Sequence, residues 1–191
     1  MTMPPFPGRT IHFGTFNVTS QVFHTTPHSF ALVNLKPLLP GHILVSPLRV
    51  KPFLSDLSHE ELSDLFLTVT RVQKTLKRLY KADAFNIAVQ DGEAAGQSVK
   101  HVHCHVIPRL KDDAGREDKV HEWLEGEEGD VGKHQGEVEG GERKSGEWAK
   151  DEERKPRTME VMEKEASWLR EEMESDAREG GGSAMPILVL N

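Results

Sequence analysis

The sequence predicts an α+β fold: a mostly antiparallel sheet of about five strands, one long helix and a C-terminal helix. Three observations support this class. Short runs of β-favouring residues alternate with proline and glycine before residue 110, a long stretch with helical spacing interrupts them, and a weaker helical pattern follows residue 157. A chain of 191 residues suits one domain with its own core, plus appendages.

The candidate strands lie on both sides of the long helical stretch. "SFALVNLKP" (29–37) and "GHILVSPL" (41–48) are rich in β-favouring residues, and the short "LLP" between them predicts an antiparallel pair. "IHFGTF" (11–16) is expected to form a further strand before them. "AFNIAVQ" (84–90) and "HVHCHVI" (101–107) are expected to form two more.

The long helical stretch begins at a capping box. The Ser58 hydroxyl can accept a hydrogen bond from the backbone of Glu61, whose carboxylate can accept one in return. Apolar residues then recur at helical spacing over about six turns: Leu62, Leu65, Phe66, Val69, Val72, Leu76 and Leu79. A second helix is expected where the pattern returns, at Met159, Met162, Ala166, Leu169 and Met173.

Composition divides the chain into four parts. Residues 1–112 carry the apolar runs and form the predicted domain core. Residues 113–156 are crowded with Glu, Lys, Asp and Gly, and are expected to be a disordered insert because they bury too little apolar surface to offset the entropy of ordering. Residues 157–179 form the C-terminal helix, and 180–191 a flexible tail.

Charge and cysteine content limit the partners. The formal net charge of -7 and pI near 5.8 argue against binding nucleic acid by phosphate neutralisation. Cys104 is the only cysteine, so an intrachain disulfide is impossible and the chain suits a reducing compartment. No signal-peptide pattern or long apolar run is visible. We therefore expect a cytoplasmic or nuclear protein with no membrane partner.

Three histidines alternate in the last candidate strand. Successive side chains of a strand face opposite sides, so His101, His103 and His105 are expected to share one face. Cys104 between them faces the other way, and we expect it to be a small buried hydrophobe and not a reactive thiol.

A metal site and phosphate chemistry are the two functional interpretations of such a strand. Alternate residues lie about 6.6 Å apart along a strand, so two imidazoles can reach one ion but the third, about 13 Å from the first, cannot easily join them. Asp91 and Glu93 in the neighbouring loop show no obvious ligand spacing. That loop, 91–100, is rich in glycine, and its N–H groups can bind an anion beside a nucleophilic imidazole. We therefore favour phosphate chemistry and expect no metal held by the protein.

The form His-apolar-His-apolar-His-apolar of "HVHCHV" resembles the signature of the histidine triad superfamily of nucleotide hydrolases and transferases. "KPLLPGHILVSPLR" and "QDGEAAGQSVKHVHCHVIPR" extend the likeness to its fragile histidine triad branch, the dinucleoside triphosphate hydrolases. The paired Gln90 and Gln97 separate this branch from the purine nucleoside phosphoramidases. The resemblance covers residues 11–110 closely and implies the histidine triad fold.

The resemblance implies cleavage of diadenosine triphosphate to AMP and ADP through a covalent nucleotidyl-histidine, as in bis(5'-adenosyl)-triphosphatases. Magnesium or manganese would enter bound to the substrate phosphates, and two chains would form a homodimer with sheets paired edge to edge. Three alternatives remain open: a dinucleotide-binding signalling module with slow turnover, a related hydrolase of phosphoramidates or nucleotidyl sulfates, and a metalloenzyme built on the histidine strand.

The same resemblance assigns the catalytic residues. His103 is the expected nucleophile, with the backbone carbonyl of His101 fixing its tautomer. His105 is expected to contact the phosphate and the leaving-group oxygen. His42 resembles the supporting histidine that hydrogen-bonds His101. Gln97 is expected to bind phosphate and position the hydrolytic water.

Substrate-binding residues follow from the resemblance as well. Asn34 is expected to bind the ribose hydroxyls, Leu32 and Phe13 to line an adenine slot, and Phe16 to lie near the base. The expected substrate-binding set is Asn34, Gln90, Gly96, Gln97, Ser98, Val99, His105, Leu32, Phe13 and Phe16.

Overall fold

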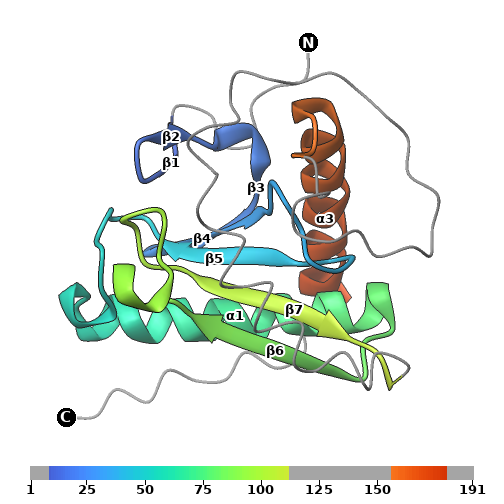
Figure 1. Cartoon of the computed structure of the whole chain (residues 1–191). Coiled ribbons are helices and arrows are strands. Elements are labelled where there is room, and N and C mark those ends of the chain that lie inside the picture. Colours follow the sequence, from blue (N-terminus) through green and yellow to red (C-terminus); the bar gives the residue numbers. More distant parts are fainter. Residues whose placement is uncertain (1–8, 112–155, 180–191) are drawn as a thin grey trace.

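The computed structural model describes residues 9–111 and 156–179, which are coloured in Figure 1. The main sheet has five strands in the order β3-β4-β5-β7-β6, and every neighbouring pair is antiparallel. Its strands are β3 (Val22–Thr25), β4 (Ser29–Val33), β5 (Ile43–Pro47), β6 (Ala84–Val89) and β7 (Cys104–Arg109). The predicted α+β fold with an antiparallel sheet is confirmed.

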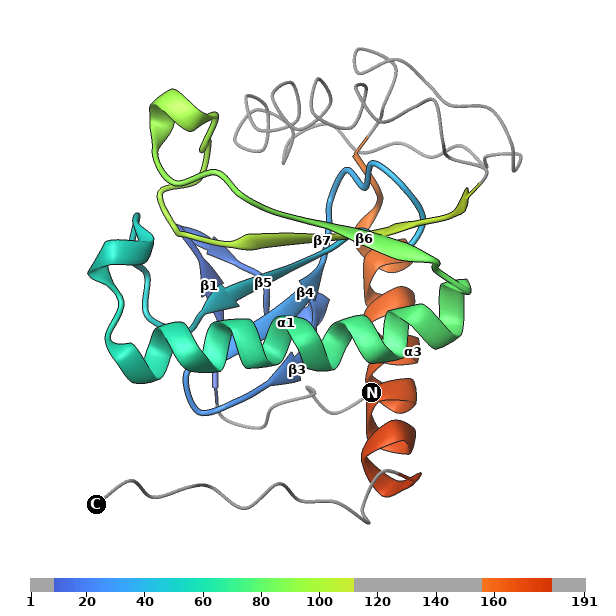
Figure 2. The same cartoon turned by 90° about the horizontal axis from the view of Figure 1, so that it is seen from below.

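The two predicted long helices are α1 (His59–Tyr80) and α3 (Met159–Glu179). The capping box at the start of α1 is formed as expected, with the Ser58 hydroxyl accepting from the backbone of Glu61 and the Glu61 carboxylate from that of Ser58. The helix ends where Lys81 adopts a left-handed conformation at φ 52°. In Figure 2, α1 lies over the face of the sheet and α3 runs crosswise to α1.

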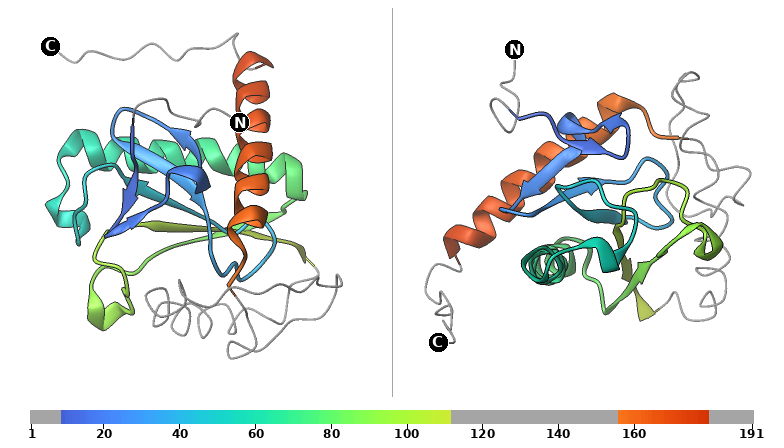
Figure 3. Two further views of the ribbon diagram at one scale, coloured as in Figure 1. Left: turned by 90° about the horizontal axis from the view of Figure 1, so that it is seen from above. Right: turned by 90° about the vertical axis from the view of Figure 1, so that its left-hand side faces the viewer.

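Both helices pack on one face of the sheet (Figure 3, right). Their buried side chains meet alternate strand residues in one apolar cluster: Phe23, Ala31, Val33, Ile43, Val45, Leu65, Val69, Val72, Leu76, Cys104, Val106, Met162, Ala166, Leu169 and Met173. Met159, which the helical pattern included, is 44% exposed and lies outside this cluster. Apolar residues that repeat about every 3.6 positions in the helices and every second position in the strands together form this core.

The prediction of one strand over residues 11–16 is wrong. These residues fold into a small hairpin of β1 (His12–Phe13) and β2 (Phe16–Asn17), because Gly14 turns the chain with φ 60°. The edge position in the main sheet belongs instead to β3, which the sequence patterns missed. β3 is short and its register shifts in a bulge, so its alternation is weak.

The hairpin covers the face of the sheet opposite the helices. A second apolar cluster joins it to that face: Ile11, Phe13, Val18, Val22, Phe30, Leu32, Leu44 and Val99, with Phe16 and Leu48 partly buried against them. Leu44 lies opposite both Leu32 and His105 in the strand register, so all three side chains share this face. The histidines therefore face the hairpin and not the helices.

The predicted insert, residues 113–156, lies outside the described residues except at Pro156, and so does the predicted tail, 180–191. Within the described ranges, neither helix combines the length and apolar character that crossing a membrane requires.

Candidate active site

The three histidines lie where the chain enters β7. The prediction of a strand over 101–107 begins too early, since β7 starts at Cys104 and only His105 of the three lies within it. All three histidines are nonetheless buried, as is Cys104 on the opposite side among the helix-facing core residues. Burial raises the pKa of the Cys104 thiol to about 12, and the predicted position of this cysteine in the core is confirmed.

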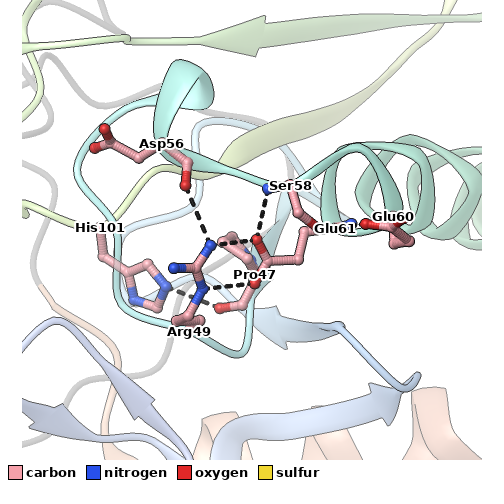
Figure 4. Close-up of polar contacts among 7 residues, drawn as sticks. All are labelled: Pro47, Arg49, Asp56, Ser58, Glu60, Glu61 and His101. Carbon is pink, nitrogen blue, oxygen red and sulfur yellow. Dashed lines mark hydrogen bonds and ion pairs between the residues drawn. The ribbon is translucent and has the colours of Figure 1, made fainter.

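His101 is held through both ring nitrogens by backbone groups. The N–H of Gly14 donates to Nδ1 over 3.1 Å, and Nε2 lies 2.8 Å from the carbonyl oxygen of Pro47 (Figure 4). A carbonyl only accepts and an N–H only donates, so His101 is the neutral tautomer with its proton on Nε2. Burial lowers the pKa of His101 to about 4, which keeps the ring neutral near pH 7.

His103 has the orientation that the sequence predicts. Its Nδ1 lies 2.8 Å from the backbone carbonyl oxygen of His101, so Nδ1 carries the proton and the lone pair is on Nε2. The Phe13 ring is stacked on His101 and meets the edge of His103, with ring centroids 5.5 and 5.0 Å apart. Phe13 thus packs against the triad as well as lying in the predicted nucleobase cluster.

A chain of hydrogen bonds fixes the tautomer of His105. The backbone N–H of Leu38 donates to Nδ1 of His42 over 3.0 Å, so the His42 proton is on Nε2. That nitrogen lies 2.9 Å from Nδ1 of His105, which therefore accepts. The remaining proton of His105 is on Nε2, 3.2 Å from Oε1 of Gln90. The chain leaves His105 as a neutral ring that presents an N–H donor.

The expected hydrogen bond from His42 to His101 is wrong, because His42 bonds His105 and both ring nitrogens of His101 bond backbone groups. The antiparallel register explains the difference. Strands β5 and β7 run in opposite directions, and Leu44 lies opposite His105. Residues that precede Leu44 therefore lie near His105 and the residues after it, whereas residues that follow Leu44 lie near the start of the triad segment. His42 therefore reaches His105, and Pro47 at the end of β5 reaches His101.

The loop before the triad positions two glutamines. Gln90 and Gln97 are both buried, with 7% and 6% of their surface exposed. Gly96 has φ 90°, and a Cβ there would lie 2.7 Å from Nε2 of Gln90, so the glycine allows the Gln90 amide to pack. Nε2 of Gln97 donates to the carbonyl oxygen of Pro52 over 2.7 Å, which orients its Oε1 as the acceptor. Ser98 is exposed on the same loop.

The predicted nucleobase residues come together in the structure. Phe13, Leu32 and Val99 are buried in the cluster under the hairpin, and Phe16 packs against it. Asn34, the predicted ribose ligand, lies just after β4 with its Nδ2 3.3 Å from Nε2 of His42. Of the side chains expected to bind base and ribose, Phe13 thus contacts His101 and His103, and Asn34 lies beside His42.

Sequence reasoning missed the groups that hold these side chains. Gly14, Leu38 and Pro47 act through backbone atoms, for which residue type gives no signal. Two nitrogens of Arg157 donate to the carbonyl oxygen of Asn34: Nε, over 3.0 Å, and Nη2. The two residues are 123 positions apart in the sequence. A contact at that separation has no local pattern.

No cluster of three or more His, Cys, Asp or Glu side chains able to hold a metal ion occurs in 9–111 or 156–179. A metal ligand needs a ring nitrogen with an available lone pair, and His101 does not offer one. In His101, Nε2 donates to Pro47 and Nδ1 already accepts from Gly14.

Comparison with known proteins identifies relatives that cover most of this chain. A bis(5'-nucleosyl)-tetraphosphatase (asymmetrical) of Schizosaccharomyces pombe is 48% identical over 170 residues, covering 84% of this chain and 92% of that protein. A bis(5'-adenosyl)-triphosphatase of Dictyostelium discoideum is 40% identical over 162 residues, covering 84% and 91%.

The fold is shared with solved structures. A crystal structure of Plasmodium falciparum diadenosine triphosphate hydrolase in complex with cyclomarin A is 29% identical, with a TM-score of 0.65 over 91% of this chain and 90% of that one. The family model of the HIT domain matches residues 15–112, more than half of the chain. The chain belongs to the HIT domain family, the histidine triad proteins.

Proposed function

We propose that this protein hydrolyses dinucleoside polyphosphates, with Nε2 of His103 attacking the α-phosphorus. The observation that carries this assignment is the contact of His103 Nδ1 with the carbonyl of His101, which places the lone pair on Nε2. The names of the two relatives above, a tetraphosphatase and a triphosphatase of dinucleosides, support the substrate class.

In the first step a bond forms between His103 Nε2 and the α-phosphorus, and the bond from that phosphorus to the bridging oxygen breaks. The Nε2–H of His105, now directed at Gln90, is positioned to donate to a phosphate or leaving-group oxygen and so to stabilise the charge that develops there. Diadenosine triphosphate would release ADP and leave AMP on His103.

In the second step water replaces the histidine. Because Gln97 Nε2 donates to the Pro52 carbonyl, its Oε1 is the suitable acceptor of a hydrogen bond that orients the attacking water. The proton that the water loses passes to the departing His103 Nε2, which becomes the leaving imidazole. Hydrolysis of the N–P bond releases AMP and restores His103. The overall reaction consumes one water and forms AMP and ADP from diadenosine triphosphate. Attack at the same phosphorus of the tetraphosphate would give AMP and ATP.

We further propose two partners of this reaction. A magnesium or manganese ion would enter with the substrate phosphates, since hard divalent cations prefer oxygen ligands and commonly arrive with nucleotides. A second copy of the chain would pair along β6, which is an edge of the sheet, whereas α3 packs against the other edge strand and Arg170 donates to the carbonyl of Val22 there.

The decisive experiment is trapping of the covalent intermediate. Protein would be mixed with diadenosine triphosphate labelled in the α-phosphate, denatured within one turnover, and assayed for protein-bound AMP. The wild type should carry label, and His103→Asn should carry none and lose most of its turnover. His24→Asn, a histidine on β3, is the control and should label normally. Label retained on His103→Asn would overturn the nucleophile.

Substrate preference can be measured in the same assay. Diadenosine triphosphate, diadenosine tetraphosphate, an adenosine phosphoramidate and an adenosine phosphosulfate would be compared by kcat/KM. We expect diadenosine triphosphate to be the best of the four. A preference for the phosphoramidate or the phosphosulfate would contradict the proposed class.

A further inference from the structure

Arg49 forms a two-point ion pair with a carboxylate of helix α1. Its Nε lies 2.7 Å from Oε1 of Glu61 and its Nη2 lies 2.5 Å from Oε2, while Nη2 also donates to the carbonyl oxygen of Asp56 (Figure 4). The Arg49 side chain is 49% exposed, whereas that of Glu61 is 11% exposed. This geometry is the paired arrangement in which a guanidinium is held in both position and direction.

Glu61 is a rigid partner for that pair. Its Oε2 also accepts the backbone N–H of Ser58 over 2.8 Å, and its own N–H donates to the Ser58 hydroxyl. The hydrogen bonds from Arg49, more than any other group, lower the pKa of Glu61 to about 2, against the opposing effect of burial. The carboxylate is therefore charged at any pH near neutrality, and α1 is fixed by its core face.

The segment that carries Arg49 is the same one that holds the start of the triad. The Ser46 hydroxyl donates to the carbonyl of Val102 over 2.9 Å, and the carbonyl of Lys51 accepts from the N–H of Val102 over 2.7 Å. Between these two contacts, the Pro47 carbonyl accepts from Nε2 of His101. The Arg49 side chain thus ties the segment 46–51 to α1.

We propose that Arg49 is a positioning residue of the histidine triad: its ion pair with Glu61 fixes the segment 46–51 so that the Pro47 carbonyl meets Nε2 of His101. That contact sets the tautomer and the orientation of His101. The backbone carbonyl of His101 in turn sets the proton of His103 on Nδ1. The first turn of α1 thereby directs the lone pair of the proposed nucleophile.

Lysine cannot replace arginine in this role. It keeps the charge but presents a single ammonium group, so it cannot hold both carboxylate oxygens of Glu61 while also reaching the Asp56 carbonyl. Arg49→Lys therefore separates the geometry of the pair from its charge.

The matched control is another arginine of α1. Arg78 lies at the far end of the helix. Its Nη1 lies 2.8 Å from Oε2 of Glu172, and its Nη2 lies 2.8 Å from Oδ1 of Asp176, both in α3. Its side chain is 46% exposed, close to the value for Arg49. Arg78→Lys thus loses a comparable ion pair at a place remote from the histidines.

Three measurements on the full chain decide the proposal. Nitrogen-15 shifts of the imidazoles report the tautomer of His101 without any substrate. Trapping of labelled AMP gives the rate of the first step, with KM measured alongside, and thermal unfolding gives stability. The adduct measurements rest on the proposed function, whereas the imidazole shifts do not. If the wild type forms no adduct, the proposed function is wrong, and the imidazole shifts still decide whether Arg49 positions His101.

For Arg49→Lys we expect the His101 shifts to lose the pattern of a single Nε2–H tautomer. The first step should slow by about tenfold or more with KM within about twofold, since small displacements of a nucleophile cost that much. Arg78→Lys should lower the unfolding temperature similarly and change neither readout. If Arg49→Lys lowers the unfolding temperature but leaves the His101 shifts and the first-step rate as in the wild type, the ion pair is only structural and the proposal is wrong.

Discussion

Nε2 of His42 lies 2.9 Å from Nδ1 of His105, within a chain of hydrogen bonds that starts at a backbone N–H of Leu38 and ends at the carboxamide of Gln90. Because the first donor is a backbone amide, the direction of every later bond is determined. His42 therefore contacts the triad through His105, whereas Gly14 and Pro47 hold His101, which in turn contacts the proposed nucleophile His103.

Removing the donor of His42 should impair the first chemical step. In His42→Leu, Nδ1 of His105 loses its donor, so the ring can adopt the other tautomer and present a lone pair to the phosphate. We expect the rate of adduct formation to fall by about 10- to 100-fold, as for other residues that orient a ligand or a catalytic ring. His42→Gln, which retains an N–H donor, should recover part of the loss. Equal rates in both variants would contradict the directed chain.

Gly96→Ala should displace Gln90. The new Cβ would lie 2.7 Å from Nε2 of Gln90, on a residue at φ 90°, where an L side chain is strained. We expect a loss of stability of about 1–3 kcal/mol in urea unfolding together with slower adduct formation. Adding Gln90→Ala should relieve the steric part, so that stability partly returns while adduct formation stays slow. A Gly96→Ala protein with wild-type stability would contradict this packing.

Arg157→Gln should weaken substrate binding more than it slows chemistry. The guanidinium holds the backbone carbonyl of Asn34 and pairs with Glu165 at 2.5 Å, so its loss allows the predicted ribose ligand to move. We expect KM to rise by about tenfold, because the loss of one hydrogen bond from a charged group has an effect of about that size. The value of kcat should stay within about threefold of the wild type. Arg170→Gln, which removes a similar bond from α3 to the Val22 carbonyl, is the control for stability alone. A fall in kcat at unchanged KM would exclude this role.

Folding stability should depend on pH between about 6.5 and 4 through two histidines. Burial, assisted at His24 by the charge of Arg71, lowers the pKa of His24 and of His101 to about 4 each. In the unfolded chain both titrate near 6.5, so below that pH the unfolded state binds more protons and stability falls. Full stability is present above about 6.5 and the loss levels off below about 4.

Urea unfolding at pH 7 and pH 5 measures this effect. Each histidine contributes at most about 1.4 kcal/mol per pH unit within the window. The folded pKa of Glu61 is lowered from 4.5 to about 2, so its contribution to stability is lost only as the pH falls below about 4.5, outside the measured range of pH 7 to 5. His24→Asn should lose about half of the pH dependence and keep the rest, which belongs to His101. A wild-type stability that is equal at the two pH values would contradict the buried neutral rings.

The sequence alone determined the features that depend on local periodicity. The capping box of Ser58 and Glu61 and the apolar spacing after it define α1, because both act within a few residues of one helix. Alternation in the triad segment separates the histidines from Cys104, and the short linker before His42 pairs β4 with β5. The family resemblance rests on the same local motifs, which is why the expected site residues could be named.

The tertiary structure decided how those residues are held. The prediction that His42 bonds His101 was wrong because only the register of β5 against β7 determines which histidine it reaches. The groups that fix the tautomers of His101 and His105 include backbone atoms of Gly14, Pro47 and Leu38. Every residue type has a backbone carbonyl, and every type except proline has a backbone N–H, so residue type does not identify these groups.

The contact of Arg157 with Asn34 was equally invisible in the sequence, since the packing of α3 brings together residues 123 positions apart. A sequence states which chemical groups are present at each position. The direction of each proton at this site depends on which distant backbone atom lies within hydrogen-bond distance, and only the folded chain determines that.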